Sequence, residues 1–269
     1  MRTALAITSY ERPDALAAVL ASVARQRVLP DEIVVADDGS SPAARALIDE
    51  HIAGSSLPVR LVAQPHQGFR VARLRNLAIA ATSAEYLVLV DGDMLLHPEF
   101  IADHLRHARR GFYSQGVRVR TDAILTSELL ESPQRFPSLF DSGLGLLRRA
   151  YLLRSAAMSA VTRRLANGFI AVKACNQGIW RTDLLKVNGF NEDMVGWGPE
   201  DKELCARLEN AGVRRQTLLF GAIACHLHHA PASRESLPRN LAILADTRRS
   251  RRIRCEHGLD GGVRRGKSG

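Results

Sequence analysis

The chain has 269 residues, of which 46% are hydrophobic and only 5% aromatic, with a formal net charge of +9. These values exclude a disordered or collagen-like chain, and the length is sufficient for a core that needs no disulfides. The four cysteines, Cys175, Cys205, Cys225 and Cys255, form no CxxC pair. We therefore expect reduced thiols, and we expect neither a zinc ribbon nor a redox motif.

Strands and helices alternate over the first part of the chain. Short apolar runs predict strands, and apolar positions at helical spacing predict the helices between them. In chain order we expect strands at 3–8, 33–36, 59–62 and 86–90, with helices starting near residue 12 and covering 43–52 and 71–81. This alternation predicts an α/β fold with a mostly parallel central sheet flanked by helices, in which ligands bind beyond the carboxyl ends of the strands.

The second part of the chain has a less regular pattern. We expect a helix from residue 98 to about 110, a strand at 116–119, helices at 182–187 and 200–210, and a strand at 218–224. Residues 144–165 are basic and apolar and predict one long helix. Such a helix either lies on a membrane surface or presents an ordinary solvated face.

No apolar run of the sequence has the length of a membrane span. The first apolar stretch ends at residue 7, too short for the hydrophobic region of a signal peptide. The most apolar later runs, 86–90 and 156–161, fall far below the roughly 20 residues that cross a bilayer. We therefore expect a cytoplasmic protein that does not itself cross a membrane.

Positive charge is concentrated at the C-terminal end. Residues 231–269, expected as a basic helix or tail, hold ten lysines and arginines against four acids, or +6 of the +9. Such a segment can contact nucleic acid or the anionic inner leaflet, or it can remain solvated. Because segments that bind nucleic acid usually carry aromatic residues and this one carries none, we favour the lipid surface and expect no nucleic-acid partner.

Acidic clusters follow two of the predicted strands. The sequence DGD at 91–93 can bind a hard divalent cation while leaving coordination positions for diphosphate oxygens, although a polar turn gives the same triplet. The sequence DDGS at 37–40 can accept hydrogen bonds from a base imide or a ribose hydroxyl. Both clusters are expected in the same crevice, which makes the pair more informative than either alone.

Three further motifs can carry chemistry. In GFRVARLRN (68–76), arginines three apart share a helix face and can counter an anion or simply be solvated. GWGPED (196–201) offers flexible glycines, an aromatic face for a sugar ring, and carboxylates that can accept a proton or merely cap a helix. CHLHH (225–229) can complete a cation site with Asp93, the alternatives being surface histidines or a zinc site.

These five motifs, in this order, resemble inverting nucleotide-sugar glycosyltransferases of the GT-A fold. The first half is similar to the bacterial family that includes polysaccharide and lipopolysaccharide transferases, and GWGPED is similar to the motif of β-galactosyltransferases and chondroitin polymerase modules. The resemblance covers residues 3 to about 230. It implies a catalytic domain over 1–230, with a Rossmann-like nucleotide-sugar half at 1–115 and an acceptor-binding half at 116–230.

The resemblance also implies roles for individual residues. The donor-binding residues would be Thr8, Tyr10, Asp38, Arg70, Arg75 and Asp91, with Arg73 as a further candidate. Asp93 and His226 would bind Mn²⁺ or Mg²⁺, and His228 and His229 leave the choice of histidine open. Asp201 would be the catalytic base and Glu200 the acceptor-binding acid, although these two could exchange roles, and Trp197 would contact the acceptor.

The implied reaction moves a hexose-type sugar, with inversion, from a nucleotide donor, expected to be a UDP-sugar, to a hydroxyl of a growing glycan. The acceptor would be a lipid-linked glycan, lipopolysaccharide or another cell-surface polysaccharide, and the enzyme would be peripheral on the inner membrane. One alternative is a nucleotidyltransferase of similar fold, whose usual Gly-rich basic loop after the first strand is missing here. Another is a sugar- or nucleotide-binding module without turnover.

Overall fold

A computed structural model describes residues 1–145, 149–162 and 171–261 of the chain. Its centre is a seven-stranded sheet with the strand order β3-β2-β1-β4-β8-β6-β9. The strands of this sheet are β1 (Thr3–Ser9), β2 (Glu32–Asp37), β3 (Val59–Ala63), β4 (Tyr86–Asp91), β6 (Phe112–Gln115), β8 (Asn176–Trp180) and β9 (Arg214–Thr217). All neighbours are parallel except at β8, which is antiparallel to β4 and β6. The predicted α/β fold with a mostly parallel sheet is thus confirmed.

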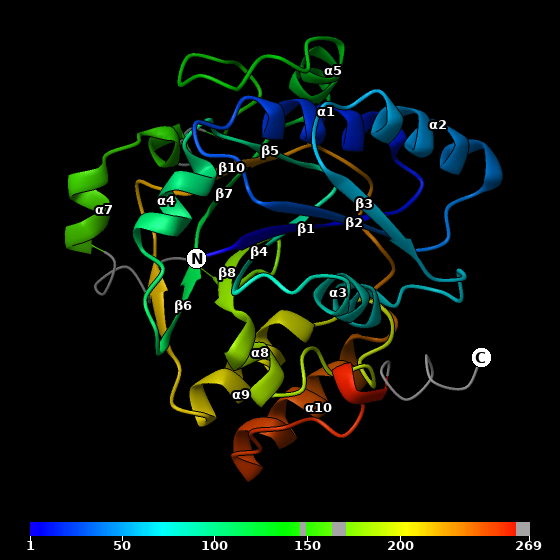
Figure 1. The fold of residues 1–269 in the computed structure, drawn as a ribbon, viewed down its shortest axis with the longest axis vertical. Coiled ribbons are helices and arrows are strands. Elements are labelled where there is room, and N and C mark those ends of the chain that lie inside the picture. Colours follow the sequence, from blue (N-terminus) through cyan, green and yellow to red (C-terminus); the bar gives the residue numbers. More distant parts are fainter. Residues whose placement is uncertain (146–148, 163–170, 262–269) are drawn as a thin grey trace.

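Helices cover both faces of this sheet (Figure 1). Helices α1 and α2 lie on one face, and α3, α8, α9 and α10 lie on the other (Figure 1). The helices are α1 (Pro13–Ala24), α2 (Pro42–Ala53), α3 (Val71–Ala80), α4 (Phe100–Arg106), α5 (Ala123–Glu131), α7 (Ala156–Thr162), α8 (Arg181–Lys186), α9 (Glu200–Asn210) and α10 (Leu237–Ser250), with a 3-10 turn η1 (Ala150–Leu152).

A hydrophobic core forms on each face of this sheet because successive side chains of a strand point to opposite faces. In β1, Leu5 and Ile7 pack into the core that contains Leu16 of α1. The alternate residue Ala6 faces the other core, with Leu204 of α9. Because both of their faces are buried, the parallel strands are continuous apolar runs in the sequence. Such runs are easy to predict as strands.

A second, three-stranded sheet joins the two halves of the chain. Its strands are β5 (Met94–Leu96), β10 (Ile223–His226) and β7 (Val117–Arg120), in the order β5-β10-β7. The antiparallel register places His226 opposite Met94, and the Leu227 amide donates to the carbonyl of Asp93 over 2.9 Å. This pairing brings the CHLHH motif to the DGD motif.

The prediction of one long helix at 144–165 was wrong for the described part of that range. Turn η1 ends at Leu152, the backbone of Leu153 is extended, and α7 starts only at Ala156. Between them, Arg154 forms an ion pair with Asp103 at 2.7 Å, and the Ser155 amide donates to the Phe220 carbonyl. These tertiary contacts override the local helical preference. Residues 146–148 and 163–165 of the predicted helix lie outside the described ranges.

Shorter elements also differ from the sequence expectations. The predicted strand at 218–224 begins only at Ile223, because Phe220 and Ala222 have positive φ angles of 65° and 46° in the turn before it. Strands β6 and β9 were not predicted, since they are four residues long and carry polar side chains. Their buried glutamines are hydrogen bonded, as when Gln216 donates to Ser114 over 2.9 Å.

The C-terminal segment begins with a packed helix. Asn240, Leu244 and Thr247 of α10 are buried, and the Thr247 hydroxyl donates to Glu203 of α9 over 3.0 Å. Leu259 then joins the core with α3 and α9. Part of the basic charge in this segment is paired, in Arg249–Asp246, Arg252–Asp246 and Arg254–Asp260.

Among the described residues, none of the helices combines the length and the hydropathy that crossing a bilayer requires. The four cysteines are buried and unpaired.

Candidate active site

The first part of the site lies at the carboxyl ends of β1 and β4. Parallel register places Thr8 beside Asp91, and the Thr8 hydroxyl donates to the Asp91 carboxylate over 3.1 Å. A Cβ on Gly92 would lie 2.5 Å from the carbonyl oxygen of Thr8. The residue between the two acids of the DGD motif must therefore be glycine, so that the strand end can turn close against β1.

The second part lies around Asp38, after β2. The side-chain amide of Gln64 donates to the buried Asp38 carboxylate, and a ring nitrogen of His66 lies 3.1 Å from the Asp38 carbonyl oxygen. The ring of Tyr10 stacks on His66 with centroids 4.6 Å apart. Gly39 has a φ of 72°, and a Cβ there would lie 2.3 Å from the His66 amide nitrogen. His66 thus contacts both Tyr10 and Asp38.

Sequence reasoning missed Gln64 and His66. Both precede the GFR motif, in a stretch without a secondary-structure pattern, so only their position just before that motif could have drawn attention to them. Arg70 belongs to the same loop, where its guanidinium donates to the Pro65 carbonyl over 2.6 Å. Arg70 therefore holds the loop that carries His66, beside the candidate donor site.

Arg75 connects the two halves of the site. Its side chain is 6% exposed, and its two terminal nitrogens lie 2.9 Å from Asp91 and 2.7 Å from Glu200. Burial alone would lower the pKa of Arg75, but the charges of Asp91 and Glu200 outweigh burial and raise it. One guanidinium on α3 thus links the DGD motif to the GWGPED motif.

The neighbouring Asn76 fixes the turn that precedes the GWGPED motif. Its side-chain amide donates to the Phe190 carbonyl over 2.9 Å and accepts from the Phe190 amide over 2.8 Å. Gly189 has a φ of 66°, and a Cβ there would lie 2.4 Å from Asn76 Oδ1. Motifs more than a hundred residues apart in the chain therefore dock directly on each other.

Glu200 and Asp201 occupy the first turn of α9. Burial raises the pKa of Glu200 to about 7 against the opposing charge of Arg75, and the adjacent Asp201 adds to the rise. Burial also raises the pKa of Asp201, again against Arg75. A carboxylate with a raised pKa is a better proton acceptor than one in water, which suits either residue to act as a general base.

The substitution Glu200→Gln should remove a pH dependence of stability. The folded protein keeps the Glu200 proton up to about pH 7, whereas the unfolded chain releases it near the ordinary value of 4.5. The contribution of Glu200 to the free energy of unfolding is thus greatest below pH 4.5 and falls as the pH rises toward 7. Urea denaturation from about pH 5 to pH 8 measures the free energy of unfolding of both proteins. The value for the wild type minus the value for the variant should decline as the pH rises. A constant difference would contradict the raised pKa.

The loop that carries Trp197 is held by α10. The buried Asn240 side chain donates to the carbonyl oxygens of Val195 and Trp197 over 3.1 and 3.3 Å. A Cβ at Gly198 would lie 2.4 Å from Asn240 Nδ2, so this glycine permits the close approach of α10. Trp197 itself is 36% exposed, with the Arg234 guanidinium 5.0 Å from its ring centroid. The indole is therefore available to a ligand while its backbone is fixed.

We expect Asn240→Ala to lower the free energy of unfolding by about 1–3 kcal/mol, because the carbonyl oxygens of Val195 and Trp197 lose their donor. The exposed neighbour Arg239 on α10 supplies the control Arg239→Ala, for which we expect a change within about 0.5 kcal/mol. Urea denaturation measures both values. Equal losses in the two variants would show that the Asn240 hydrogen bonds contribute nothing specific.

The third part of the site is a cluster of one acid and two histidines. Nε2 of His226 and Nε2 of His229 lie 3.5 and 3.2 Å from Asp93 Oδ2. One ligand atom from each of these three residues lies within 4.8 Å of the others. The second carboxylate oxygen of Asp93 is buried and has no hydrogen-bond partner among the described residues. A carboxylate, two imidazoles and an orphaned buried oxygen fit a divalent cation.

The charges of these three residues act on one another. Burial would raise the pKa of Asp93, but hydrogen bonding to His229 and the charge of His226 outweigh it and lower the pKa. Hydrogen bonding to Asp93 raises the pKa of His229, whereas burial lowers that of His226. The structure thus adds His229 to the predicted His226. His228 stays outside the cluster, where its ring is exposed and its amide donates to Thr126.

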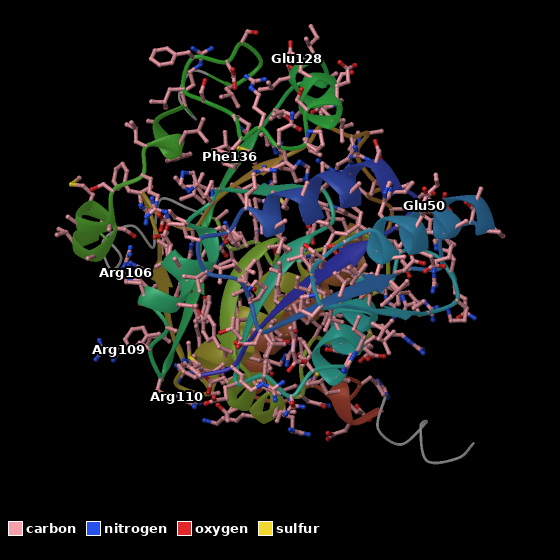
Figure 2. All side chains as sticks on the ribbon, turned by 45° about the horizontal axis from the view of Figure 1, so that its top comes forward. Glu50, Arg106, Arg109, Arg110, Glu128 and Phe136 are labelled. Atoms are coloured by element: carbon pink, nitrogen blue, oxygen red, sulfur yellow. The ribbon has the colours of Figure 1, made fainter. Side chains whose placement is uncertain are left out.

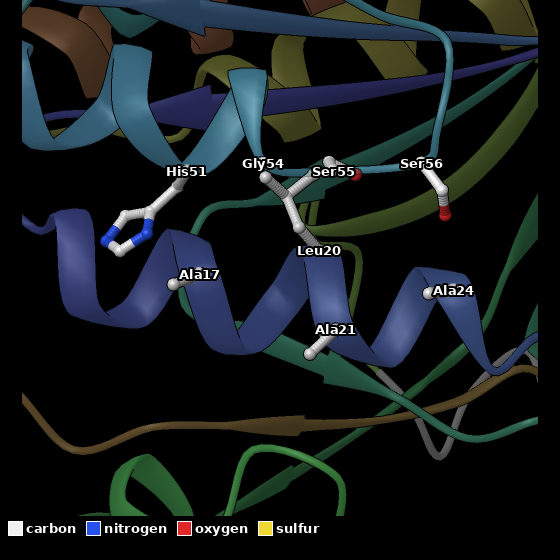
Figure 3. Close-up of a pocket in the computed structure, with 8 residues that line it drawn as sticks. All are labelled: Ala17, Leu20, Ala21, Ala24, His51, Gly54, Ser55 and Ser56. Carbon is white, nitrogen blue, oxygen red and sulfur yellow. The ribbon is translucent and has the colours of Figure 1, made fainter.

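Other features of the molecule lie away from these residues. A cavity of about 260 Å³ lies between α1 and the end of α2, and its lining contains none of the candidate site residues (Figure 3). Arg106, Arg109 and Arg110 gather at one side of the molecule, beyond the sheet (Figure 2). Neither feature places polar groups next to the acidic motifs.

A mostly parallel sheet with acidic motifs at its strand ends is the architecture of GT-A glycosyltransferases. Solved structures share it. S. aureus TarS 1–349 in complex with UDP matches with a TM-score of 0.62 at 15% identity, over 97% of this chain and 68% of that chain. The same TarS fragment in complex with UDP-GlcNAc matches with a TM-score of 0.59 at 14% identity, over 97% and 69%.

The chain belongs to glycosyl transferase family 2, whose model matches residues 5–165. Residues 164–230 match a second family model, the N-terminal domain of galactosyltransferase. Together these matches confirm the resemblance proposed from the motifs, including its two parts.

Curated relatives include a glucosyltransferase and a chondroitin synthase. The chain is 28% identical over 218 residues to validoxylamine A glucosyltransferase of Streptomyces hygroscopicus subsp. limoneus, covering 77% of this chain and 48% of the relative. It is 25% identical over 236 residues to chondroitin synthase of Escherichia coli, covering 82% and 34%. The chain thus spans about half or less of the length of these relatives.

Proposed function

We propose that this chain is an inverting glycosyltransferase that moves a hexose-type sugar from a UDP-sugar to a hydroxyl group of a glycan. The observation that carries the proposal is the Arg75 bridge, with Asp91 at 2.9 Å on one side and Glu200 at 2.7 Å on the other. It joins an acidic motif suited to a nucleotide-sugar donor to a pair of carboxylates suited to activate an acceptor. The UDP and UDP-GlcNAc held by TarS, a protein of the same fold, support the choice of donor.

In this proposal the residues of the first half bind the donor. Tyr10 and Asp38 contact the nucleobase and ribose, and Thr8, Asp91 and Arg75 lie nearer the sugar. Asp93, His226 and His229 would hold Mn²⁺ or Mg²⁺, which when bound supplies positive charge for the leaving diphosphate.

The residues of the second half activate the acceptor. Asp201 takes the proton of the acceptor hydroxyl, and the oxygen attacks the anomeric carbon from the face opposite the leaving group. The new carbon–oxygen bond forms as the bond to the diphosphate breaks, so an α-linked donor gives a β-linked product. Glu200 and Trp197 position the acceptor, with the indole packing against a sugar ring.

The experiment that tests the proposal is a donor screen. The protein would be incubated with UDP-, GDP- and dTDP-sugars, Mn²⁺ and a panel of glycan acceptors, and release of nucleoside diphosphate would be measured. We expect release from a UDP-hexose that increases when acceptor is added. Release of inorganic pyrophosphate would indicate a nucleotidyltransferase instead, and donor binding without any release would indicate a binding module.

We further propose that the acceptor belongs to a lipid-linked or cell-surface glycan such as lipopolysaccharide, and that α10 contacts the anionic inner leaflet. Arg239 and Arg248 are exposed on α10 together with Leu241. Each arginine near an anionic surface contributes about 1 kcal/mol, so the double variant Arg239→Gln/Arg248→Gln should bind phosphatidylglycerol vesicles about 30-fold more weakly in cosedimentation. Equal sedimentation of the two proteins would refute this contact.

A further inference from the structure

Three basic residues form a group that the proposed reaction does not use. They are Arg118 and Arg120 on β7 and Lys173, which lies just before β8, and we call them the cationic strip. Arg118 and Arg120 project from the same face of β7, because Val117 and Val119 point to the opposite side and are buried there. The guanidinium of Arg118 lies 3.8 Å from the sulfur of Cys175, two residues after Lys173, so the strip crosses from one sheet to the other.

The cationic strip lies between the two reactive parts of the site. The parallel register of β7 and β10 places Arg120 opposite His226 of the metal cluster. At the other end, Lys173 is near enough to Asp201 for the two opposite charges to attract, which partly offsets the lowering of the Lys173 pKa by burial. The strip therefore runs from the candidate cation site toward the candidate base.

In the described part of the chain, the charges of Lys173 and Arg118 lack a close acidic partner. Among the residues that the structure describes, no carboxylate forms an ion pair with Lys173 or with Arg118. Burial lowers the pKa of Lys173, and repulsion from Arg118 and Arg120 lowers it further. Like charges held together beside a binding site lower the free energy of a bound anion, because the anion relieves their repulsion.

We propose that the cationic strip binds an anionic substituent of the acceptor, a carboxylate or a phosphate, close to the hydroxyl that receives the sugar. The inference rests on the proposed function and names the class of acceptor, a glycan with acidic residues. The acceptor hydroxyl must come within hydrogen-bond reach of Asp201, and Lys173 is the strip residue whose charge is coupled to Asp201. An acidic group on or next to the acceptor residue would then meet Lys173 and Arg118.

The test compares acceptors that differ only in charge. One oligosaccharide carries a terminal hexuronate, the second is the same oligosaccharide after reduction of the carboxyl group, and the third carries a phosphate monoester. Kinetic constants would be measured for the wild type, Lys173→Gln, Arg118→Gln and the control Lys186→Gln. Lys186 is an exposed lysine of α8 that bonds only to the Ala211 carbonyl among the described residues.

We expect each strip variant to raise the KM for an anionic acceptor by about tenfold or more, the usual effect of losing one charge-assisted hydrogen bond. The KM for the neutral acceptor and for the donor should stay within about twofold, as should all constants of Lys186→Gln. Equal effects on the charged and neutral acceptors would overturn the proposal. An effect on the donor KM alone would also overturn it, because the strip would then hold the donor diphosphate.

A binding measurement gives the same comparison without turnover. Calorimetry of the three oligosaccharides with the protein loaded with UDP and Mn²⁺ should show tighter binding of the two anionic ones to the wild type, and no such preference in Lys173→Gln. Equal affinities of the wild type for the charged and neutral oligosaccharides would refute the proposal that the cationic strip binds an anionic group of the acceptor. A failure of the proposed function would appear separately, as a lack of diphosphate release from every donor.

Discussion

Replacement of Asp201 by Asn should lower turnover by about 10²-fold or more while leaving donor affinity unchanged, as expected when a general base is lost. The amide keeps the size of the side chain and can still accept the hydrogen bond that the Lys202 amide now donates to Asp201 over 2.7 Å. Folding and donor binding should therefore be preserved. Steady-state kinetics measure the loss of turnover, and calorimetry with UDP measures donor affinity.

The matched control for this variant is Glu209→Gln on the same helix. Glu209 is an exposed acid that accepts a hydrogen bond from the Tyr113 hydroxyl, which a glutamine can also accept. We expect its turnover to stay within about twofold of the wild type. If Asp201→Asn were equally active, Asp201 would have no role as base, and the raised pKa of Glu200 would make that residue the next candidate.

The substitution Asp93→Ala should abolish the Mn²⁺ dependence of donor binding. Asp93 supplies the only carboxylate of the cluster with His226 and His229, and imidazoles alone hold a hard cation poorly when a diphosphate must share it. Calorimetric titration with a UDP-sugar, with and without Mn²⁺, measures the effect. In the wild type we expect the metal to strengthen binding, and in the variant we expect equal, weak binding under both conditions.

An exposed acid on α2, Asp49, provides the control for charge removal. Asp49→Ala on α2 removes one carboxylate that pairs with Arg45 and should keep the full metal effect. Undiminished, metal-dependent donor binding by Asp93→Ala would refute the assignment of the cation site.

The fold was predictable where a local pattern and burial agree. Strands β1, β2 and β4 lie inside the parallel sheet, so both of their faces are apolar and the runs are unmistakable. Strands β6 and β9 were missed because their buried polar side chains are satisfied by partners from other elements, which one sequence segment does not reveal. The prediction of a helix at 144–165 was wrong in the described part of that range for a related reason. Arg154 and Ser155 bond to residues of other elements, and one sequence segment does not reveal such contacts.

The site was predictable from residue types rather than from distances. Parallel strands bring their carboxyl ends to one edge, so DDGS and DGD could be expected at the same edge. Both motifs flank the end of β1, where the Asp38 amide donates to the Ser9 carbonyl and the Thr8 hydroxyl donates to Asp91. The contribution of His229 depends on how the chain turns after β10, and that of Gln64 on a loop without regular structure. Asn240 gave no signal either, because its contact with the Trp197 loop depends on the packing of α10. The chemical roles of these residues remain predictions.

The most direct test of the central claim is a crystal structure of the protein with Mn²⁺ and a UDP-sugar analogue that resists hydrolysis. Anomalous scattering from manganese would locate the cation independently of the protein density. The account predicts a peak in coordination contact with Asp93 and at least one of His226 and His229, with the anomeric carbon between the cation and Asp201. A nucleotide bound elsewhere, such as in the cavity between α1 and α2, or an anomeric carbon facing away from Asp201, would contradict it.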